Sequence, residues 1–377
     1  MHEDTVIGIL KENGIDCALT LPCDKARDLF FLLPEKFPHI GLSREEDGVG
    51  VSAGEYLAGK RPAMVIQSSG LGNMLNALLS LHRTYDLPLP IIASWRGGDT
   101  EKIPAQIPFN RALPKILDAA GIPCTIIGSG DELGKIGTVI RKSFDEKIPC
   151  VALIAPPCLE DPDPSCSPVC GTRRDSRPAV HLVYERPARN PAMTRYEAIR
   201  SLMTHLPDET AVVANIGVPG RELYAVRDRN LNFYMLGSYT QASPIGFGIA
   251  HAAPKRDVVV LDGDGSLLGT AILPVIASTR PANLTIICLD NGTFGSTGNQ
   301  PNTAAVSADL ELLAIAAGFT NTCRVQTPEE IRAALETPGS GPRFIHVVIR
   351  PGNSDVKNIP CNPAFIRDRF MQALQRN

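Results

Sequence analysis

The sequence predicts two α/β domains of similar size, each built on a doubly wound parallel sheet. Three observations lead to this expectation. The chain has 377 residues, which is more than one ordinary hydrophobic core accommodates. Short apolar runs alternate with segments of helical periodicity, as strands buried between two layers of helices do. A proline-rich stretch interrupts the alternation near the middle of the chain.

The first predicted domain covers residues 1–155. Runs such as CALTLPC and PAMVIQS are almost continuously apolar, which is typical of strands covered on both faces. Between these runs, apolar residues recur with helical spacing. The expected strands are residues 17–23, 62–68, 89–95, 124–129 and 150–155. The expected helices are residues 24–33, 45–59, 71–82 and 131–144.

Residues 156–192 read as a linker, because they are dense in proline, serine and charge and show no helical period. Cys158, Cys166 and Cys170 lie in this stretch. Their spacing does not match a paired C-x-x-C metal site, so we interpret them as loop thiols. Most other cysteines lie in or beside apolar runs, which suits reduced side chains packed as small hydrophobes.

The second predicted domain, residues 193–377, repeats the architecture without repeating the sequence. Its apolar runs are again separated by helical patterns of ordinary length. The expected strands are residues 210–216, 232–236, 257–262, 284–290 and 343–350. The expected helices are residues 194–205, 243–252, 267–278, 307–317 and 328–336.

The composition argues against several classes of partner. Apolar residues make up 44% and charged residues 20% of the chain, as in soluble globular proteins. The formal charge of −3 and the lack of a basic run argue against nucleic-acid binding. The sequence has no stretch of about 18 apolar residues, so it predicts no membrane span. The start, MHEDTVIGIL, does not resemble a signal peptide. We therefore expect a cytoplasmic protein.

Two polar residues follow apolar runs in the second half. Asp264 lies between Gly263 and Gly265 after one expected strand, and Asn291 follows the next strand. Ligands of open parallel sheets bind at the carboxyl ends of strands, and glycines allow a bulky group to approach the backbone. A carboxylate, an amide oxygen and a loop carbonyl suit Mg²⁺ bound to a diphosphate. Each dipeptide alone is more typical of an ordinary turn.

The GDG turn, followed after some 25 residues by an asparagine turn, resembles the signature of the thiamine-diphosphate-dependent enzymes. The resemblance implies that Asp264, Asn291 and the carbonyl of Thr293 hold the metal. Asp290 stands where the family commonly has a first asparagine. In the same family a bulky apolar residue 25 positions before the metal aspartate lies under the cofactor, and Tyr239 has this position here. The implied cofactor contacts in this half are Gly237, Ser238, Tyr239, Gly263, Gly265 and Ser266.

A second acid is expected from the first half, in SREEDGVGVSAGEYLAGKRP. On its own, an acidic helix start is explained by the helix dipole. In the family, however, a glutamate nine positions before the glycine of an A-G pair hydrogen-bonds the aminopyrimidine ring. Counting back from Gly54 gives Glu45 as the catalytic residue, and a slip of one position would give Glu46. The segment QSSGLGN adds Gly70 and Asn73 as implied cofactor contacts.

Over nearly its whole length the chain resembles the sulfopyruvate decarboxylases, with the α-like and β-like halves fused. The segments TLPC, SREEDGVG, SSGLGN, SWRGG and NGTFGSTGNQ carry this resemblance. It implies a pyrimidine domain, a diphosphate domain, and decarboxylation of 3-sulfopyruvate for coenzyme M biosynthesis. The substrate is a 2-oxoacid with an anionic tail, and we expect Arg96, Asn299 and Gln300 to bind it.

Three other interpretations stay open at this stage. The phosphonopyruvate decarboxylases are similar but tend to have GGQ where this chain has Gly298, Asn299 and Gln300. A carboligase of the acetolactate synthase type would normally have a middle domain, for which residues 156–191 are too short and irregular. A third class is a cofactor-binding protein without catalysis. The family also implies a homodimer or higher homo-oligomer with active sites at subunit interfaces.

Overall fold

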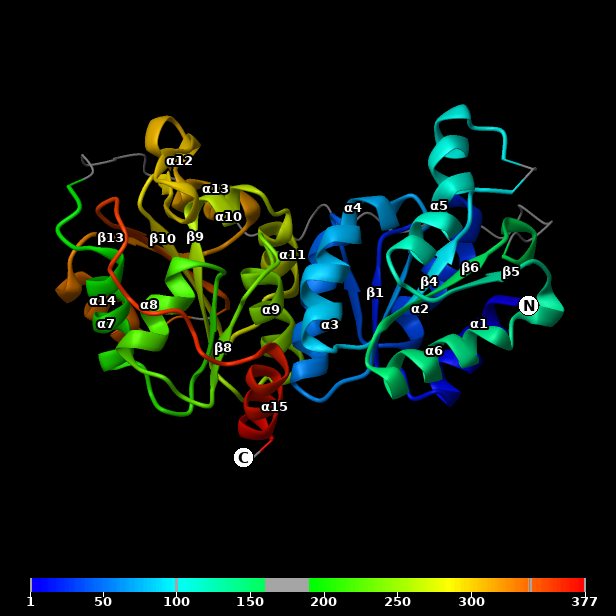
Figure 1. Cartoon of the computed structure of the whole chain (residues 1–377), viewed down its shortest axis with the longest axis horizontal. Coiled ribbons are helices and arrows are strands. Elements are labelled where there is room, and N and C mark those ends of the chain that lie inside the picture. The colour runs from blue at the N-terminus through cyan, green and yellow to red at the C-terminus, as the bar shows by residue number, and fades with distance from the viewer. Residues whose placement is uncertain (1, 99–100, 160–189, 338, 340, 376–377) are drawn as a thin grey trace. The chain divides into compact units, whose positions relative to one another are not determined.

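The computed structural model describes residues 2–98, 101–159, 190–337, 339 and 341–375. The chain divides into two compact units, Met1–Arg173 and Arg174–Asn377, which are described separately below. Each unit contains one six-stranded sheet in which all the paired strands run parallel (Figure 1). In the part of the chain that is described, no third domain lies between them. The predicted α/β fold with two parallel sheets is therefore confirmed.

In the first unit the strand order is β2-β1-β3-β4-β6-β5. The chain moves outward from β1 to β2 on one side and through β3 to β4 on the other, so the strand order reverses at β1. Loops leaving the carboxyl ends of strands diverge at such a point and can leave room for a ligand. The strands are β1 (Cys17–Thr20), β2 (His39–Gly41), β3 (Pro62–Gln67), β4 (Leu89–Ser94), β5 (Cys124–Ile127) and β6 (Pro149–Ile154).

Helices cover both faces of this sheet. On one face α1, α2 and α6 enclose a core in which Leu10, Leu33 and Ile140 meet the apolar side chains of the strands. On the other face α3 packs on β1 and β3, with α4 beside it (Figure 1). The helices are α1 (His2–Glu12), α2 (Arg27–Lys36), α3 (Glu45–Leu57), α4 (Gly70–Ala77), α5 (Ile107–Ala119) and α6 (Lys135–Glu146). Short helical turns are η1 (Asp24–Ala26), η2 (Leu78–Arg83), η3 (Pro104–Gln106), η4 (Gly130–Glu132) and η5 (Pro156–Cys158).

In the second unit the strand order is β13-β14-β10-β9-β7-β8, and it reverses between β7 and β9. Leu289 of β10 pairs with Gly263 of β9, so these two neighbouring strands end side by side. The strands are β7 (Ala211–Ala214), β8 (Asn232–Tyr234), β9 (Val258–Gly263), β10 (Leu284–Asp290), β13 (Asn321–Val325) and β14 (Arg343–Val348). A small antiparallel hairpin consists of β11 (Thr293–Phe294), η7 (Gly295–Thr297) and β12 (Gln300–Pro301).

The helices of the second unit also form two layers. One layer contains α9, α11 and α13, and the other contains α7, α8 and α14 (Figure 1). The helix expected over residues 267–278 is two helices, α10 and α11, separated by Gly269, Thr270 and Ala271. The helices are α7 (Arg195–His205), α8 (Val218–Val226), α9 (Ala242–Ala252), α10 (Asp264–Leu268), α11 (Ile272–Thr279), α12 (Thr303–Val306), α13 (Leu310–Ala317), α14 (Pro328–Glu336) and α15 (Pro363–Leu374).

Cys158, at the start of the predicted linker, is not the loop thiol that the sequence led us to expect. Cys158 is buried in the core of the first unit, where it packs with Leu159 and Ile154. Its backbone carbonyl accepts a hydrogen bond from the ring of His2. Cys166 and Cys170 lie outside the described residues. Cys158 therefore behaves as a small core residue rather than as an exposed thiol.

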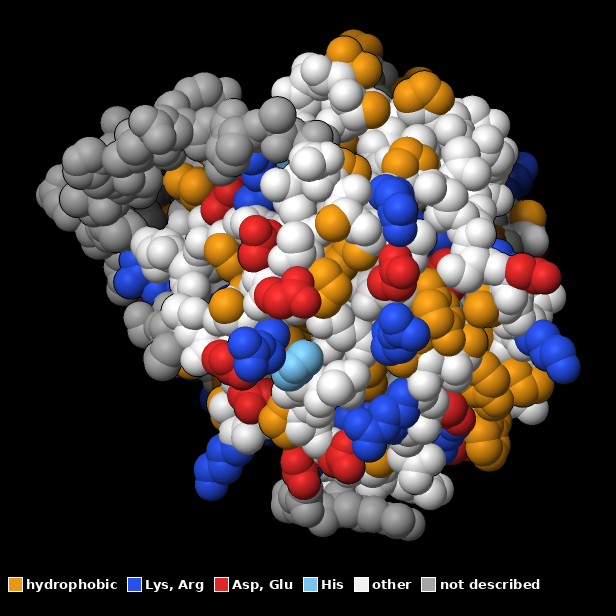
Figure 2. Space-filling view, turned by 90° about the vertical axis from the view of Figure 1, so that its left-hand side faces the viewer, with side chains coloured by type: hydrophobic (Ala, Val, Ile, Leu, Met, Phe, Trp, Pro, Cys, Tyr) orange, Lys and Arg blue, Asp and Glu red, His pale blue; other side chains and the backbone are white. Residues whose placement is uncertain are grey.

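The surface carries charges of both signs. On the face that Figure 2 shows, Lys and Arg side chains are interspersed with Asp and Glu side chains and do not gather into one basic patch. Among the helices of the described ranges, none is both long and apolar enough to cross a bilayer.

Candidate active site

Asp264 lies at the carboxyl end of β9, where the chain enters α10. Its side chain is only 3% exposed. One carboxylate oxygen accepts a hydrogen bond from the backbone N–H of Gly265 at 2.7 Å. The other accepts from the backbone N–H of Gly292, beyond the neighbouring strand, at 2.8 Å. The two strand ends that the sequence placed side by side are thus joined through this carboxylate.

Asn291 and Thr293 occupy the turn after β10. Asn291 is buried, and its Oδ1 accepts a hydrogen bond from the backbone N–H of Thr293 at 3.0 Å. Its Nδ2 is buried without a hydrogen-bond partner among the described residues. Gly292 has a φ of 69°, a conformation that favours glycine. The turn therefore presents an amide oxygen and backbone carbonyls, and its Gly292 N–H joins it to the Asp264 carboxylate.

The electrostatics of this turn favour a bound cation. Burial, followed by the nearby Asp290 carboxylate, raises the pKa of Asp264 to about 7. Two carboxylates held close together in a dry place repel each other when both are ionised. A divalent cation would relieve this repulsion, and oxygen ligands are those that Mg²⁺ prefers.

A hollow of about 720 Å³ lies beside Asp264 on the surface of the second unit. Tyr239 and Phe294 are two of its side chains, and the Tyr239 hydroxyl donates to the carbonyl of Gly265 at 2.5 Å. A Cβ on Gly265 would lie 2.4 Å from the Phe294 ring, so only glycine allows this ring to lie so close to the turn. The hollow is lined by Tyr239, Gly265, Leu268, Gly269, Phe294, Pro301, Asn302, Thr303, Val306 and Ser307.

The other predicted cofactor contacts of this unit lie next to Tyr239 or next to Asp264. Gly237 and Ser238 precede Tyr239, and Ser238 has a φ of 68°. The Ser238 hydroxyl is buried and has no hydrogen-bond partner in the described part of the chain. Gly263 is the last residue of β9, and Ser266 lies buried in the first turn of α10. The buried unpaired hydroxyl of Ser238 is a vacant donor and acceptor of the kind that a ligand satisfies.

Glu45 is the first residue of α3, in the first unit, and is 9% exposed. Its Oε2 accepts a hydrogen bond from Nδ2 of Asn73 at 3.1 Å. A Cβ on Gly70 would lie 2.4 Å from Glu45 Oε1, so this glycine makes room for the carboxylate. The structure thus brings together three residues that the sequence analysis selected separately. Glu46 is different, because its half-buried carboxylate pairs with Arg44 at 2.7 Å.

Arg96 follows β4 and is almost fully buried, at 2% exposure. Its Nη1 pairs with Asp24 at 2.7 Å, and its Nε pairs with the buried carboxylate of Glu101. The hydrogen bond from Arg96 lowers the pKa of Glu101 to about 2. Two carboxylates thus already compensate the guanidinium charge. Nη2 is the one guanidinium nitrogen that is buried without a partner among the described residues.

Asn299 and Gln300 lie on the exposed hairpin that follows the Asn291 turn. The Gln300 side chain is engaged within the hairpin, since it donates to the Thr297 carbonyl at 2.9 Å and accepts from the Thr297 hydroxyl at 2.8 Å. The base of the hairpin is held by Asn353, which donates to the Gly295 carbonyl at 2.7 Å. Asn353 in turn accepts from Arg195, which forms a buried ion pair with Glu222 at 2.8 Å.

Sequence reasoning missed Asp262, which is fully buried beside the GDG turn. Burial raises its pKa, and its carboxylate accepts hydrogen bonds from Ser243 Oγ at 2.6 Å and from the Gly263 N–H at 2.9 Å. It therefore fixes the end of β9 against α9. A signal was present, because an acid at the end of the apolar run VVVLD has to be buried with partners.

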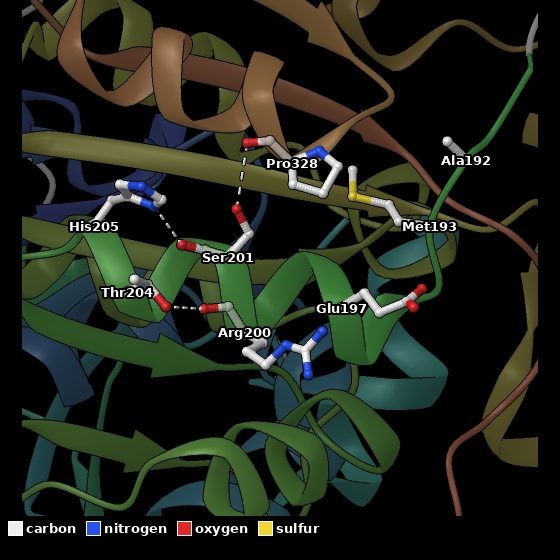
Figure 3. A pocket seen from close by; sticks show the side chains of 8 residues that line it. All are labelled: Ala192, Met193, Glu197, Arg200, Ser201, Thr204, His205 and Pro328. Atoms are coloured by element: carbon white, nitrogen blue, oxygen red, sulfur yellow. Dashed lines mark hydrogen bonds between the residues drawn. The ribbon is translucent and has the colours of Figure 1, made fainter.

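A second hollow, of about 370 Å³, lies along α7 and contains none of the predicted site residues (Figure 3). Its polar groups are engaged locally. Ser201 donates to the Pro328 carbonyl at 3.4 Å, the His205 ring bonds the Ser201 carbonyl at 2.8 Å, and Glu197 pairs with Arg350 at 3.3 Å. These contacts run to three different places, the helix itself, Pro328 and Arg350, and not to a common point, so we assign no role to this hollow.

Comparison with protein families gives one match in each unit. Residues 2–122 match the thiamine pyrophosphate enzyme, N-terminal TPP binding domain, and residues 220–347 match the C-terminal TPP binding domain. The fold and the paired domains therefore define a thiamine pyrophosphate enzyme.

Two relatives show which group of thiamine pyrophosphate enzymes the chain resembles. Over 383 residues the chain is 45% identical to the sulfopyruvate decarboxylase of Methanosarcina acetivorans, covering 99% of this chain and 97% of the relative. It is 32% identical to the phosphonopyruvate decarboxylase of Streptomyces viridochromogenes, covering 97% of this chain and 91% of that one. The chain belongs to the family of thiamine pyrophosphate enzymes that contains these two decarboxylases.

Solved structures agree on the fold. The benzoylformate decarboxylase of Polynucleobacter necessarius superimposes with a TM-score of 0.71 at 13% identity, covering 95% of this chain and 99% of that one. At this identity the likeness concerns the fold alone.

Proposed function

We propose that this protein decarboxylates 3-sulfopyruvate without oxidation, giving sulfoacetaldehyde and CO₂ with uptake of one proton. The 45% identity over nearly the whole length of a sulfopyruvate decarboxylase carries this proposal. Such a reaction would serve coenzyme M biosynthesis. The second candidate is phosphonopyruvate, which the 32% identical relative favours. Both substrates are 2-oxoacids with an anionic tail and differ mainly in the charge and shape of that tail.

The donor set of the second unit fits Mg²⁺ bound to the diphosphate of thiamine diphosphate. Asp264, Asn291 Oδ1 and the Thr293 carbonyl supply hard oxygens, and the buried unpaired Nδ2 of Asn291 supplies a vacant donor. Gly263 and Gly265 bring no side chain to the GDG turn, Ser266 follows them, and Tyr239, which comes after Gly237 and Ser238, borders the adjoining hollow. The bound cofactor supplies the electron sink for loss of CO₂.

Glu45 is proposed to accept a hydrogen bond from the aminopyrimidine ring. Its burial and its bond from Asn73 keep the carboxylate oriented, and Gly70 keeps the space next to Oε1 free of a side chain. A carboxylate in a dry place interacts more strongly with a ring proton than one in water. Glu46 differs from it, because its carboxylate is already paired with Arg44.

The anionic tail is proposed to bind to Arg96, Asn299 and Gln300. Arg96 would offer its unpaired Nη2, since its other nitrogens are engaged by Asp24 and Glu101. The two amides would add neutral donors from the exposed hairpin. A sulfonate carries one charge and a phosphonate up to two, so a site with one compensated cation and neutral donors favours the sulfonate.

The test is a parallel assay of 3-sulfopyruvate and phosphonopyruvate with the full chain, thiamine diphosphate and Mg²⁺. We expect CO₂ release from both substrates, with kcat/KM at least about tenfold higher for sulfopyruvate, which corresponds to about 1.4 kcal/mol of transition-state binding. A preference for phosphonopyruvate would replace the proposed substrate by the second candidate. If neither substrate releases CO₂, both proposed substrates are wrong.

We further propose that the active protein is a homodimer or larger, with Glu45 and Asp264 of different chains acting on one cofactor. Mixing two inactive variants tests this. Glu45→Gln and Asp264→Asn chains should together form one intact site in each mixed dimer, so random mixing restores about a quarter of wild-type activity. Sites formed within one chain would restore none. Sedimentation of each variant alone is the control for assembly.

A further inference from the structure

We infer that His346 is a positioning residue for the metal-binding turn, residues 290–293, and that it acts through Asp290. The inference rests on the proposed Mg²⁺ site and concerns residues that touch neither metal nor substrate directly. Neither the family signature nor the sequence pattern assigned a role to this histidine.

His346 lies on β14, the strand next to β10, and is fully buried. It stands opposite Cys288 in the parallel register, so its ring reaches along β10 toward the strand end. Its Nε2 donates to Oδ2 of Asp290 at 2.7 Å. Asp290 itself is 1% exposed. A buried carboxylate is costly unless donors satisfy it, so this contact fixes the Asp290 side chain on the β14 side.

The other oxygen of Asp290 connects to the metal-binding turn. Oδ1 accepts from the Gly292 N–H at 3.0 Å, and the same N–H lies 2.8 Å from Oδ2 of Asp264. Two carboxylates therefore share one backbone donor. If Asp290 lost the bond from His346, its carboxylate would turn toward that donor or toward the cation. Either movement would displace Asp264 or change the number of ligands.

The other ring nitrogen, Nδ1, is buried and has no hydrogen-bond partner among the described residues. Nδ1 of His346 lies 3.8 Å from Oδ1 of Asp309, and Asp309 caps α13 by accepting from the Leu312 N–H at 3.1 Å. Arg324 lies 3.6 Å from the other oxygen of Asp309. The imidazole is thus placed between the carboxylate at the metal-binding turn and one at a helix start. The hydrogen bond to Asp290 is the one that orients the ring among the described residues.

The experiment measures Mg²⁺ affinity by titration calorimetry on the full-length apo-protein in the presence of thiamine diphosphate. Partners that orient a metal ligand typically contribute about 10–100-fold to metal affinity. We expect His346→Ala to weaken Mg²⁺ binding by about that factor. His346→Gln, which keeps a donor on a side chain of similar length, should recover most of the affinity and also covers the case in which the alanine variant does not fold.

Two further variants separate positioning from general destabilisation. Phe344→Leu changes a fully buried residue two positions earlier on the same face of β14, so it should lower the unfolding temperature but leave Mg²⁺ affinity unchanged. In an Asp290→Asn background, where no buried carboxylate needs a donor, His346→Ala should change Mg²⁺ affinity less than about threefold.

Wild-type affinity in His346→Ala would overturn the inference. So would an equal loss in Phe344→Leu, or a loss of the same size with and without Asp290. If the wild-type protein itself binds no Mg²⁺ with thiamine diphosphate, the proposed metal site fails, and the inference fails with it. That result is distinguished from the others because it appears before any substitution is made.

Discussion

Glu45→Gln is expected to lower kcat/KM for the 2-oxoacid by about 10³-fold, within the range that one positioned acid–base group contributes. The amide keeps the size of the side chain and the contact with Asn73 but cannot hold the ring proton as a carboxylate does. Because Glu45 is buried at the first turn of α3, no water replaces the lost charge. The measurement is steady-state CO₂ release together with calorimetric titration of thiamine diphosphate.

Cofactor binding separates this explanation from a folding defect. Affinity for thiamine diphosphate should stay within a few-fold of wild type, since the residues proposed to hold the diphosphate belong to the second unit. Glu46→Gln is the matched control, because it changes the neighbouring acid, which is paired with the exposed Arg44, and should leave turnover nearly unchanged. If Glu46→Gln is inactive and Glu45→Gln is active, the catalytic residue is the neighbour.

The sequence predicted the central strands better than the edges of the sheets. Strands such as β4 and β9 are buried on both faces and therefore read as apolar runs. The missed strands β2 and β13 lie at the edges of their sheets, and β13 has the sequence NTCRV, in which most side chains are only half-buried. An edge strand has one free side and needs fewer apolar residues, so its pattern resembles a loop.

The helices α1, α5, α8, α12 and α15 were not expected from the sequence, and in α5 and α8 proline weakened the helical pattern. The helix α5 contains Pro114 in its interior, and α8 begins with the segment VPG. Prolines near a helix start are compatible with the helix, but they also mark loops, so the pattern alone does not decide between the two. The packing of α8 against α7 and β7 determines the outcome, and that contact is not visible in the local sequence.

In the candidate site, too, some features could be predicted from the local sequence and others could not. The positions of Asp264 and Asn291 at neighbouring strand ends could be predicted, because strand ends of a parallel sheet lie at one edge and both residues follow apolar runs. The partners of Arg96 could not, since Asp24 reaches it from 72 positions away and nothing local marks the pair. The contact between Asp290 and His346 spans 56 positions. Such contacts depend on strand order and register, which the periodicity of one strand does not encode.

Asp264→Asn is expected to weaken the binding of thiamine diphosphate with Mg²⁺ by at least about 100-fold, as loss of one charged partner from a buried pair does. Asp264 is the one charged group of the proposed ligand set. It also accepts from the Gly265 and Gly292 N–H groups, so an amide would place its own N–H toward one of these donors. Both effects act on the same turn.

The measurement is calorimetric titration of the cofactor with Mg²⁺ and, separately, with EDTA in its place. Wild type should lose most of its affinity for thiamine diphosphate in EDTA. Asp264→Asn should bind the cofactor weakly under both conditions, because the variant does not hold the ion that couples protein to diphosphate even when Mg²⁺ is supplied. Asp257→Asn, an exposed acid before the start of the same strand β9, is the matched control and should behave as wild type. If Asp264→Asn keeps its Mg²⁺-dependent affinity for thiamine diphosphate, the metal and the diphosphate of the cofactor bind elsewhere.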